Sequence, residues 1–252
     1  MSAPAPSAPL ERLVRIVRER RPCVVLTGAG ISTESGIPDF RSPQGIWARY
    51  DPREYATIDA FLADPVKVWG FYARRLRMLE EVEPNDGHLA LAELERRGWV
   101  RAVITQNIDR LHARAGSREL VEVHGSYATA SCLACGSVFP YDEYVALLPL
   151  PECPECGRIL KPDVVLFGEL LPEDAIARAA ELAASAGLLL VVGSSLEVYP
   201  VAGLPLSTLS GGGSLAIVNR GSTELDGLAS VTIDGGAGET LRALASALPE
   251  SP

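Results

Sequence analysis

The sequence predicts an α/β fold: a doubly wound parallel sheet with a smaller second lobe formed by insertions. Short apolar runs alternate with helical segments along most of the 252 residues. Such alternation is typical of a parallel sheet that is covered by helices on both faces. Two stretches break the alternation, residues 40–83 and 127–162, and we expect them to form the second lobe.

The elements of the main domain follow from the apolar pattern. Apolar residues at positions 10, 13, 14, 16 and 17 have helical spacing, and short apolar runs have the length of buried strands. This reasoning gives strands over 23–27, 100–105, 121–123, 188–192, 215–218 and 231–233, and helices over 10–21, 88–97, 173–185 and 239–248. The main domain is then expected to comprise residues 10–39, 84–126 and 163–252, after a disordered tail over residues 1–9.

The composition excludes several classes of protein. Lys and Arg total 23 against 32 Asp and Glu, a net charge of −9, which disfavours non-specific nucleic-acid binding. No apolar run approaches the roughly 20 residues that span a bilayer, and the start of the chain lacks the features of a secretory or transit peptide. We expect a cytoplasmic protein without nucleic-acid or membrane partners, and we expect it to be a monomer.

Four of the five cysteines form a pattern that predicts a zinc site. They read C-x2-C-x17-C-x2-C, from Cys132 and Cys135 to Cys153 and Cys156. In a cytoplasmic chain, two such pairs indicate a tetrahedral four-thiolate site rather than disulfides. Four sulfur ligands leave no position open for water, so the zinc would stabilise the lobe without taking part in catalysis. The alternative is four unrelated free thiols, and Cys23 is expected to be a buried core residue.

A glycine-rich turn follows the first expected strand. Gly28-Ala29-Gly30 and Ser32 lie between that strand and an expected helix, where backbone amides can approach a diphosphate closely. The pattern also fits a plain strand-to-helix turn. Thr33 replaces the third glycine of the usual dinucleotide fingerprint, and no acidic residue follows the next strand, so an ordinary dehydrogenase is disfavoured.

Polar residues also follow the strand over 100–105. Gln106, Asn107 and Asp109 stand at the carboxyl end of this strand, which faces the ligand crevice in parallel sheets. A structural role, capping the next helix, fits Asp109 but not the whole group.

The histidines fall in different settings. His88 precedes a helix and is expected to cap it, and His112 is expected to be a hydrogen-bonded structural residue. His124 ends an apolar strand and precedes Gly125. This place suits a general base, because imidazole titrates near neutral pH.

Taken together, these motifs resemble those of the sirtuins, which are NAD-dependent protein lysine deacylases. The matching segments come in order along nearly the whole chain: G-A-G-I-S at 28–32, G-I-P-D-F-R at 36–41, T-Q-N-I-D-x-L-H at 105–112, H-G at 124–125, the cysteine pairs, K-P-x-V-V-x-F-G-E at 161–169, G-S-S at 193–195 and V-Y-P at 198–200. Any one motif is weak, whereas the ordered set is specific. The resemblance implies a Rossmann-like NAD-binding domain, one structural zinc in the small lobe, and NAD, consumed as co-substrate, in the cleft between the lobes.

The resemblance also implies which residues contact NAD. The glycine-rich turn would lie against the diphosphate, a flexible loop would cover the nicotinamide ribose, and later turns would contact the adenosine. The matching residues are Gly28, Ala29, Gly30, Ser32, Asp39, Phe40, Arg41, Trp47, Gln106, Asn107, Ile108, Asp109, Gly193, Ser194, Ser195, Asn219 and Ala237. The resemblance assigns catalysis to His124, as general base, and to Asn107.

The implied substrate is a protein with an acylated lysine, bound as an extended strand. The implied products are the deacylated lysine, nicotinamide and 2′-O-acyl-ADP-ribose. Backbone hydrogen bonds would hold the peptide between two stretches. Their residues are Val164, Val165, Phe167, Gly168, Glu197 and Val198.

Three further residues bear on the acyl group. Tyr72 and Arg75 lie three apart on a helix expected over 65–79, so they share a face. Spacing alone favours a packing tyrosine beside a solvated arginine. With the small Ala56 upstream, however, the pair resembles the acyl pocket of sirtuins that remove succinyl, malonyl and glutaryl groups, in which Arg75 would bind a carboxylate.

Other functions remain open from the sequence. They are a plain NAD-dependent deacetylase, a mono-ADP-ribosyltransferase, a non-enzymatic module that binds NAD or peptide, and a redox protein built on the C-x-x-C pairs. A binding module would have no need of both His124 and Asn107, and a tightly bound metal would exclude the redox protein.

Overall fold

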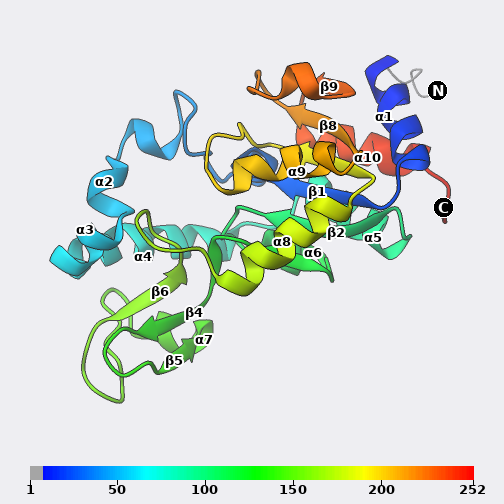
Figure 1. Ribbon diagram of the computed structural model, residues 1–252. Helices are drawn as coiled ribbons and strands as arrows, with labels where there is room; N and C mark the ends of the chain where they lie inside the picture. Colours follow the sequence, from blue (N-terminus) through cyan, green and yellow to red (C-terminus); the bar gives the residue numbers. More distant parts are fainter. Residues whose placement is uncertain (1–7) are drawn as a thin grey trace.

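The computed structural model describes residues 8–252, and its centre is a six-stranded sheet (Figure 1). The strands lie in the order β3-β2-β1-β7-β8-β9, and every neighbouring pair is parallel. This is the order of a doubly wound sheet, so the predicted fold class is confirmed, with the reversal of winding between β1 and β7. The bounds are β1 Cys23–Thr27, β2 Val100–Thr105, β3 Leu120–Glu122, β7 Leu188–Val192, β8 Ser214–Asn219 and β9 Val231–Asp234.

Helices cover both faces of this sheet. Alternate residues of β1 point to opposite cores: Val25 packs beneath α1, α5 and α10, whereas Val24 and Leu26 pack beneath α8 and α9. Burial on both faces explains why these strands are continuous apolar runs in the sequence. The bounds are α1 Ala8–Glu19, α5 Asp86–Arg96, α8 Glu173–Ser185, α9 Leu204–Ser210 and α10 Ala237–Ala247.

The first helix begins earlier than the apolar spacing predicts. Of the disordered tail expected over residues 1–9, positions 1–7 lie outside the described residues, whereas Ala8 and Pro9 are the first residues of α1. Proline is tolerated there because the first N–H groups of a helix have no intrahelical partner.

The smaller lobe is built from the two stretches that interrupt the alternation. Three antiparallel strands in the order β5-β4-β6 pack with helix α4 around a separate core, away from the two chain ends in Figure 1. The buried Trp69 of α4 joins the two stretches, because its Nε1–H donates to the carbonyl oxygen of Leu160 at 2.7 Å. The bounds are α2 Pro52–Tyr55, α3 Ile58–Ala63, α4 Pro65–Glu81, β4 Gly125–Cys132, β5 Val138–Pro140, α7 Tyr141–Val145 and β6 Leu160–Val164. The short helix α6, Leu111–Ala115, follows β2 in the main sheet.

The described part of the chain, residues 8–252, contains no helix that is long and apolar enough to cross a bilayer.

Candidate active site

A cleft of about 1300 Å³ opens where β1 and β7 end, at the point where the winding reverses. Ligands of doubly wound sheets bind at this place, and the volume exceeds the roughly 300–1,000 Å³ of a typical small-molecule site. All but two of the predicted site residues outside the cysteine cluster line the cleft: Gly28, Ala29, Gly30, Asp39, Phe40, Arg41, Trp47, Ala56, Tyr72, Arg75, Gln106, Asn107, Ile108, His124, Val164, Val165, Phe167, Gly168, Gly193, Ser194, Ser195, Glu197, Val198, Asn219 and Ala237. The two exceptions, Ser32 and Asp109, are absent from this lining.

The floor of the cleft is backbone. The N–H of Gly30 donates to the carbonyl oxygen of Gly193 at 2.8 Å, so the turns after β1 and β7 touch directly. A Cβ atom on Gly28 would lie 2.8 Å from that carbonyl oxygen, and one on Gly30 would lie 2.7 Å from the Gly193 Cα. Side chains are therefore excluded here, which lets a ligand approach the backbone closely.

The helix expected after β1 is present, and it is a short 3₁₀ helix. Residues Ala29–Ser35 form a 3₁₀ helix, η1, which ends at Gly36 with φ of +89°. Thr33 Oγ1 donates back to the carbonyl oxygen of Gly30 at 2.9 Å, a local bond that competes with α-helical hydrogen bonding. The cleft thus faces one tight turn here rather than the start of a long helix.

Ser32 and Asp109 form a hydrogen-bonded pair. Ser32 is almost fully buried, and its hydroxyl donates to Asp109 Oδ2 at 2.7 Å. The amide nitrogen of Asn107 donates to Ser32 Oγ and to the carbonyl oxygen of Gly28, each at 3.1 Å. The pair thereby fixes the Asn107 side chain at the cleft wall, while Asp109 Oδ1 caps α6 by accepting the N–H of Leu111 at 2.9 Å.

The His124 ring lines the cleft in one defined orientation. Its Nδ1 lies 3.0 Å from the carbonyl oxygen of Gln106, which can only accept, so Nδ1 carries the proton and Nε2 is the basic nitrogen. Burial lowers the pKa of His124, and the Gln106 carbonyl opposes this shift. A neutral imidazole with a free Nε2 can accept a proton near pH 7.

The other two histidines have the structural roles that the sequence predicted. His88 Nδ1 accepts the N–H of Asn85 in a capping box at the start of α5. His112 is buried, with Nε2 2.9 Å from Thr27 Oγ1. Burial lowers the pKa of His88 to about 4 and that of His112 to about 3, so both are neutral at pH 7.

A loop from Asp39 to Trp47 forms one rim of the cleft. Its ends are held together by backbone bonds, and the Phe40 and Trp47 rings lie 5.3 Å apart. Arg41 crosses to the opposite rim, where its Nε lies 3.0 Å from the Glu197 carboxylate. Both side chains are about half exposed, so this pair is weak and leaves the rims free to separate.

One end of the cleft lies at the carboxyl ends of β7 and β8. Gln106 Nε2 donates to Ser194 Oγ at 2.9 Å, and Asn219 ends β8 at the cleft wall. The sequence reasoning missed Arg220 and Glu34, which also line this end. Glu34 accepts the N–H of Gly238 in the first turn of α10 at 3.0 Å, a contact 204 positions apart that no local pattern reveals.

The opposite end of the cleft, beside α4, holds the three residues that resemble an acyl pocket in the sequence. Ala56 and Tyr72 are buried, and the Arg75 guanidinium lies 5.5 Å from the Phe40 ring and 5.6 Å from the Phe71 ring. Among residues 8–252, Arg75 makes no ion pair with a carboxylate. Phe71 was missed, although it shares a helix face with Arg75 at a spacing of four residues.

The chain from β6 to Phe167 runs extended along the same end, and it turns at Gly168. Two backbone hydrogen bonds hold it in place. The N–H of Val165 donates to the His124 carbonyl oxygen and that of Phe167 to the Ala56 carbonyl oxygen, each at 2.8 Å. The buried Lys161 supports it by bonding the Val164 carbonyl oxygen and the Glu169 carboxylate, each at 3.0 Å.

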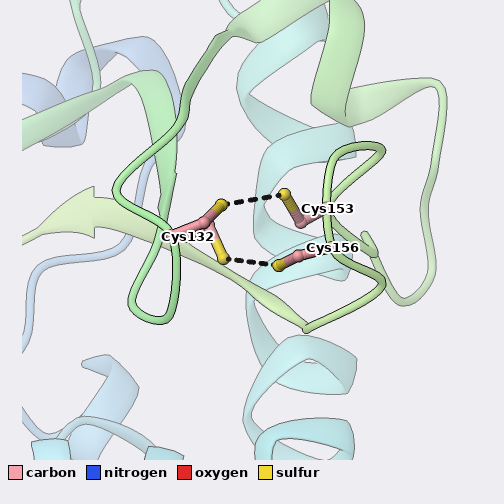
Figure 2. A group of neighbouring side chains, drawn as sticks. Cys132, Cys153 and Cys156 are labelled. Atoms are coloured by element: carbon pink, nitrogen blue, oxygen red, sulfur yellow. Dashed lines mark hydrogen bonds between the residues drawn. The ribbon is translucent and has the colours of Figure 1, made fainter.

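The four cysteines of the small lobe converge on one point (Figure 2). The Sγ atoms of Cys132 and Cys156 lie 3.5 Å apart and those of Cys135 and Cys153 lie 3.6 Å apart, and all four fall within 4.8 Å of one another. Four sulfurs at about 2.3 Å from a tetrahedral zinc would be about 3.8 Å apart. The cluster therefore fits a structural Zn²⁺ with no open coordination position.

Fold and site together define a two-lobed protein. One lobe is a doubly wound sheet with a cleft at the place where such sheets bind nucleotides, and the other carries a four-cysteine zinc site. Residues 28–200 match the model of the Sir2 family. The chain belongs to this family.

Curated relatives and solved structures agree with this assignment. The chain is 49% identical over 226 residues to "NAD-dependent protein deacylase 2" of Pyrobaculum aerophilum, covering 90% of each chain. It is 47% identical over 247 residues to "NAD-dependent protein deacylase" of Thermus thermophilus, covering 96% of this chain and 95% of that one. A Sir2 structure described as containing a peptide and NAD+ superposes with a TM-score of 0.86 at 39% identity, over 94% of this chain and 97% of that one.

Proposed function

We propose that this chain is an NAD-dependent protein lysine deacylase that prefers carboxylate-bearing acyl groups, such as succinyl and malonyl, and also removes acetyl groups. The names of its relatives support the deacylase activity. The acyl preference rests on one observation: the Arg75 guanidinium lines the cleft without a carboxylate partner among the described residues.

The cleft suits NAD as co-substrate. When bound, NAD supplies a ribose carbon that can receive the acyl oxygen as nicotinamide leaves. The backbone of the turn at Gly28 and Gly30 would hold the diphosphate, and Gly193, Asn219 and Ala237 would contact the adenosine. Gln106 and Asn107 would then position the nicotinamide ribose, since both line the cleft on the side nearer His124.

His124 would act as the general base. The Gln106 carbonyl holds its Nδ1 proton, so Nε2 is free to take a proton from a ribose hydroxyl. The ribose 2′-oxygen would then bond to the acyl carbon, and one water would supply an oxygen as the lysine nitrogen leaves, so the products would be a free lysine and 2′-O-acyl-ADP-ribose.

The acylated peptide would bind as an extended strand. The stretch 164–167 is already extended and is held by backbone hydrogen bonds to Ala56 and His124, before the chain turns at Gly168. Its outer edge, with the turn at Glu197 and Val198 across the cleft, is suited to pair with a peptide backbone. Recognition through the backbone tolerates many sequences around the lysine.

The acyl pocket would select by size and charge. The small Ala56 side chain leaves room for an acyl chain longer than acetyl. At the pocket's end the Arg75 guanidinium could bind a carboxylate through two N–H groups, and the Tyr72 hydroxyl could add a hydrogen bond.

The test is a matched pair of variants on acetyl-lysine and succinyl-lysine peptides. Arg75→Met keeps the side-chain length but removes the charge, which leaves the succinyl carboxylate unpaired and costs about 2–5 kcal/mol. Desuccinylation kcat/KM should therefore fall by about 10²-fold or more, whereas deacetylation should change little. Arg77→Met is the control, because Arg77 is an exposed arginine on the same helix.

Two results would contradict this proposal. Equal loss of both activities in Arg75→Met would make Arg75 a structural residue. A wild-type protein that removes succinyl groups no faster than background would be a plain deacetylase.

We also propose that the protein works in the cytoplasm as a monomer, on protein substrates and without nucleic acid. The net charge of −9 supports the lack of nucleic-acid binding. Light scattering coupled to gel filtration tests the monomer, since a mass of twice 26.8 kDa would contradict it.

A further inference from the structure

One buried hydroxyl beside the acyl pocket has no partner. Tyr127, the third residue of β4, is 1% exposed, and within residues 8–252 its Oη forms no hydrogen bond. Leaving a buried hydroxyl unpaired is unfavourable, so its presence calls for an explanation. Phenylalanine would fill the same space without this disadvantage.

The surroundings of Tyr127 point to the acyl pocket. Its ring packs edge-on against Tyr72, with ring centres 6.0 Å apart. Burial raises the pKa of the Tyr127 phenol, and the positive charge of the Arg75 guanidinium opposes that shift. Tyr72, whose ring contacts Tyr127, shares a face of α4 with Arg75 three residues on, so the buried Tyr127 hydroxyl and the Arg75 guanidinium belong to the same corner of the pocket, although no hydrogen bond joins them in this structure.

Arg75 itself is held only loosely. Its guanidinium lies over the rings of Phe40 and Phe71, and it pairs with no carboxylate of residues 8–252. A guanidinium has five N–H donors, of which a bidentate carboxylate uses two. At least one donor is left to fix the plane of the fork, and Tyr127 Oη is a buried oxygen of this pocket that has no partner.

We propose that Tyr127 is a positioning residue of the acyl pocket: its Oη accepts an N–H of Arg75 and holds the guanidinium fork toward the acyl carboxylate. This inference rests on the proposed function. Tyr127 does not line the cleft, so it acts through Arg75 and not on the substrate directly. Its backbone is fixed for this role, because Tyr144 Oη donates to the Tyr127 carbonyl oxygen at 2.8 Å.

The experiment compares Tyr127→Phe with the wild type on acetyl-lysine and succinyl-lysine peptides. The substitution removes only the hydroxyl and keeps the ring against Tyr72. We expect kcat/KM for succinyl to fall about tenfold, mainly through a higher KM, because one hydrogen bond to a charged group is lost. Deacetylation should be unchanged, and the melting temperature should be equal or higher.

A double-mutant cycle separates positioning from packing. In the Arg75→Met background, Tyr127→Phe should have no further effect on desuccinylation, since the group it positions is gone. Tyr141→Phe is the control: it removes a tyrosine hydroxyl of the same lobe that donates to the exposed Glu80 and not to the pocket, so both acyl activities should stay unchanged.

The contrary outcomes are distinguishable. Equal loss on both peptides in Tyr127→Phe, or additive effects with Arg75→Met, would make Tyr127 a packing residue and overturn the inference. No loss in Tyr127→Phe beside a large loss in Arg75→Met would also overturn it, and would leave the proposed acyl preference standing. A wild type without desuccinylase activity would overturn both.

Discussion

The backbones of Gly30 and Gly193 are in direct contact, so a single methyl group added at this place should disrupt the site. Gly193 has φ of +62°, and a Cβ there would press on the backbone nitrogen of Ile31 and lie 2.6 Å from the Gly30 carbonyl carbon. The variant Gly193→Ala therefore meets two costs. The left-handed backbone costs about 1–2 kcal/mol for a residue with a Cβ, and overpacking against backbone adds about 1–3 kcal/mol.

The expected effect is a loss of about 3 kcal/mol in the free energy of unfolding, with a larger effect on NAD. The turns after β1 and β7 must separate to admit the methyl, which breaks the bond from the Gly30 N–H to the Gly193 carbonyl. Because the turn at Gly30 is the proposed diphosphate site, NAD affinity should fall by more than about tenfold. Urea unfolding followed by tryptophan fluorescence measures the first quantity, and calorimetric titration with NAD measures the second.

The chain provides a control with the same backbone and no crowding. Gly212 has φ of +81°, and nothing lies within 4 Å of the position of its Cβ. Gly212→Ala should lose only the backbone part, about 1–2 kcal/mol, and should bind NAD normally. If Gly193→Ala matches Gly212→Ala in stability and binds NAD like the wild type, the closeness of the two turns has no functional meaning and the reasoning fails.

Three further predictions concern the base, the metal and pH. His124→Ala should lower deacylation by about 10²–10⁴-fold while NAD still binds, and turnover above a tenth of wild type would refute its role as base. Elemental analysis should find one zinc per chain, and active protein without metal would exclude the site. Cys153→Ser should lower the melting temperature, and kcat should fall only as a consequence of this lost stability. His88 and His112 have pKa values of about 4 and about 3 in the fold, against 6.5 as the ordinary value, so the unfolded chain binds more protons below pH 6.5. The free energy of unfolding should therefore decrease as the pH is lowered from roughly 6 to 4, by up to about 1.4 kcal/mol per histidine and pH unit. His112→Gln should halve this slope, and an unchanged slope would show that carboxylates cause it.

The central sheet was predictable because its information is local. The strands at Cys23–Thr27 and Leu188–Val192 are fully buried, and both coincide with apolar runs whose ends are marked in the sequence. The cysteine pairs were predictable for a similar reason, since each pair comes from one short turn. In these places a few neighbouring residues carry the whole signal.

The strands of the small lobe were not predictable, because their burial depends on distant partners. Strand β6, Leu160–Val164, contains Lys161 and Pro162, which argue against a strand in a sequence pattern. The lysine is buried only because Glu169 and nearby carbonyl oxygens receive its charge. Similarly, Ser32 and Asp109 resemble ligand contacts by motif, yet their pairing across 77 positions is seen only in three dimensions.

The joining of the small lobe from two separate stretches has a consequence for motion. Trp69 comes from the first stretch and Leu160 from the second, and both belong to one continuous core. The chain therefore passes between the lobes four times, and no single cut releases the smaller one. A hinge at any one of these connections is restrained by the other three, so the lobe can only tilt as a rigid unit. Any narrowing of the cleft must then move its acyl end and its peptide edge together. The fit of the acyl group and the binding of the peptide are therefore coupled.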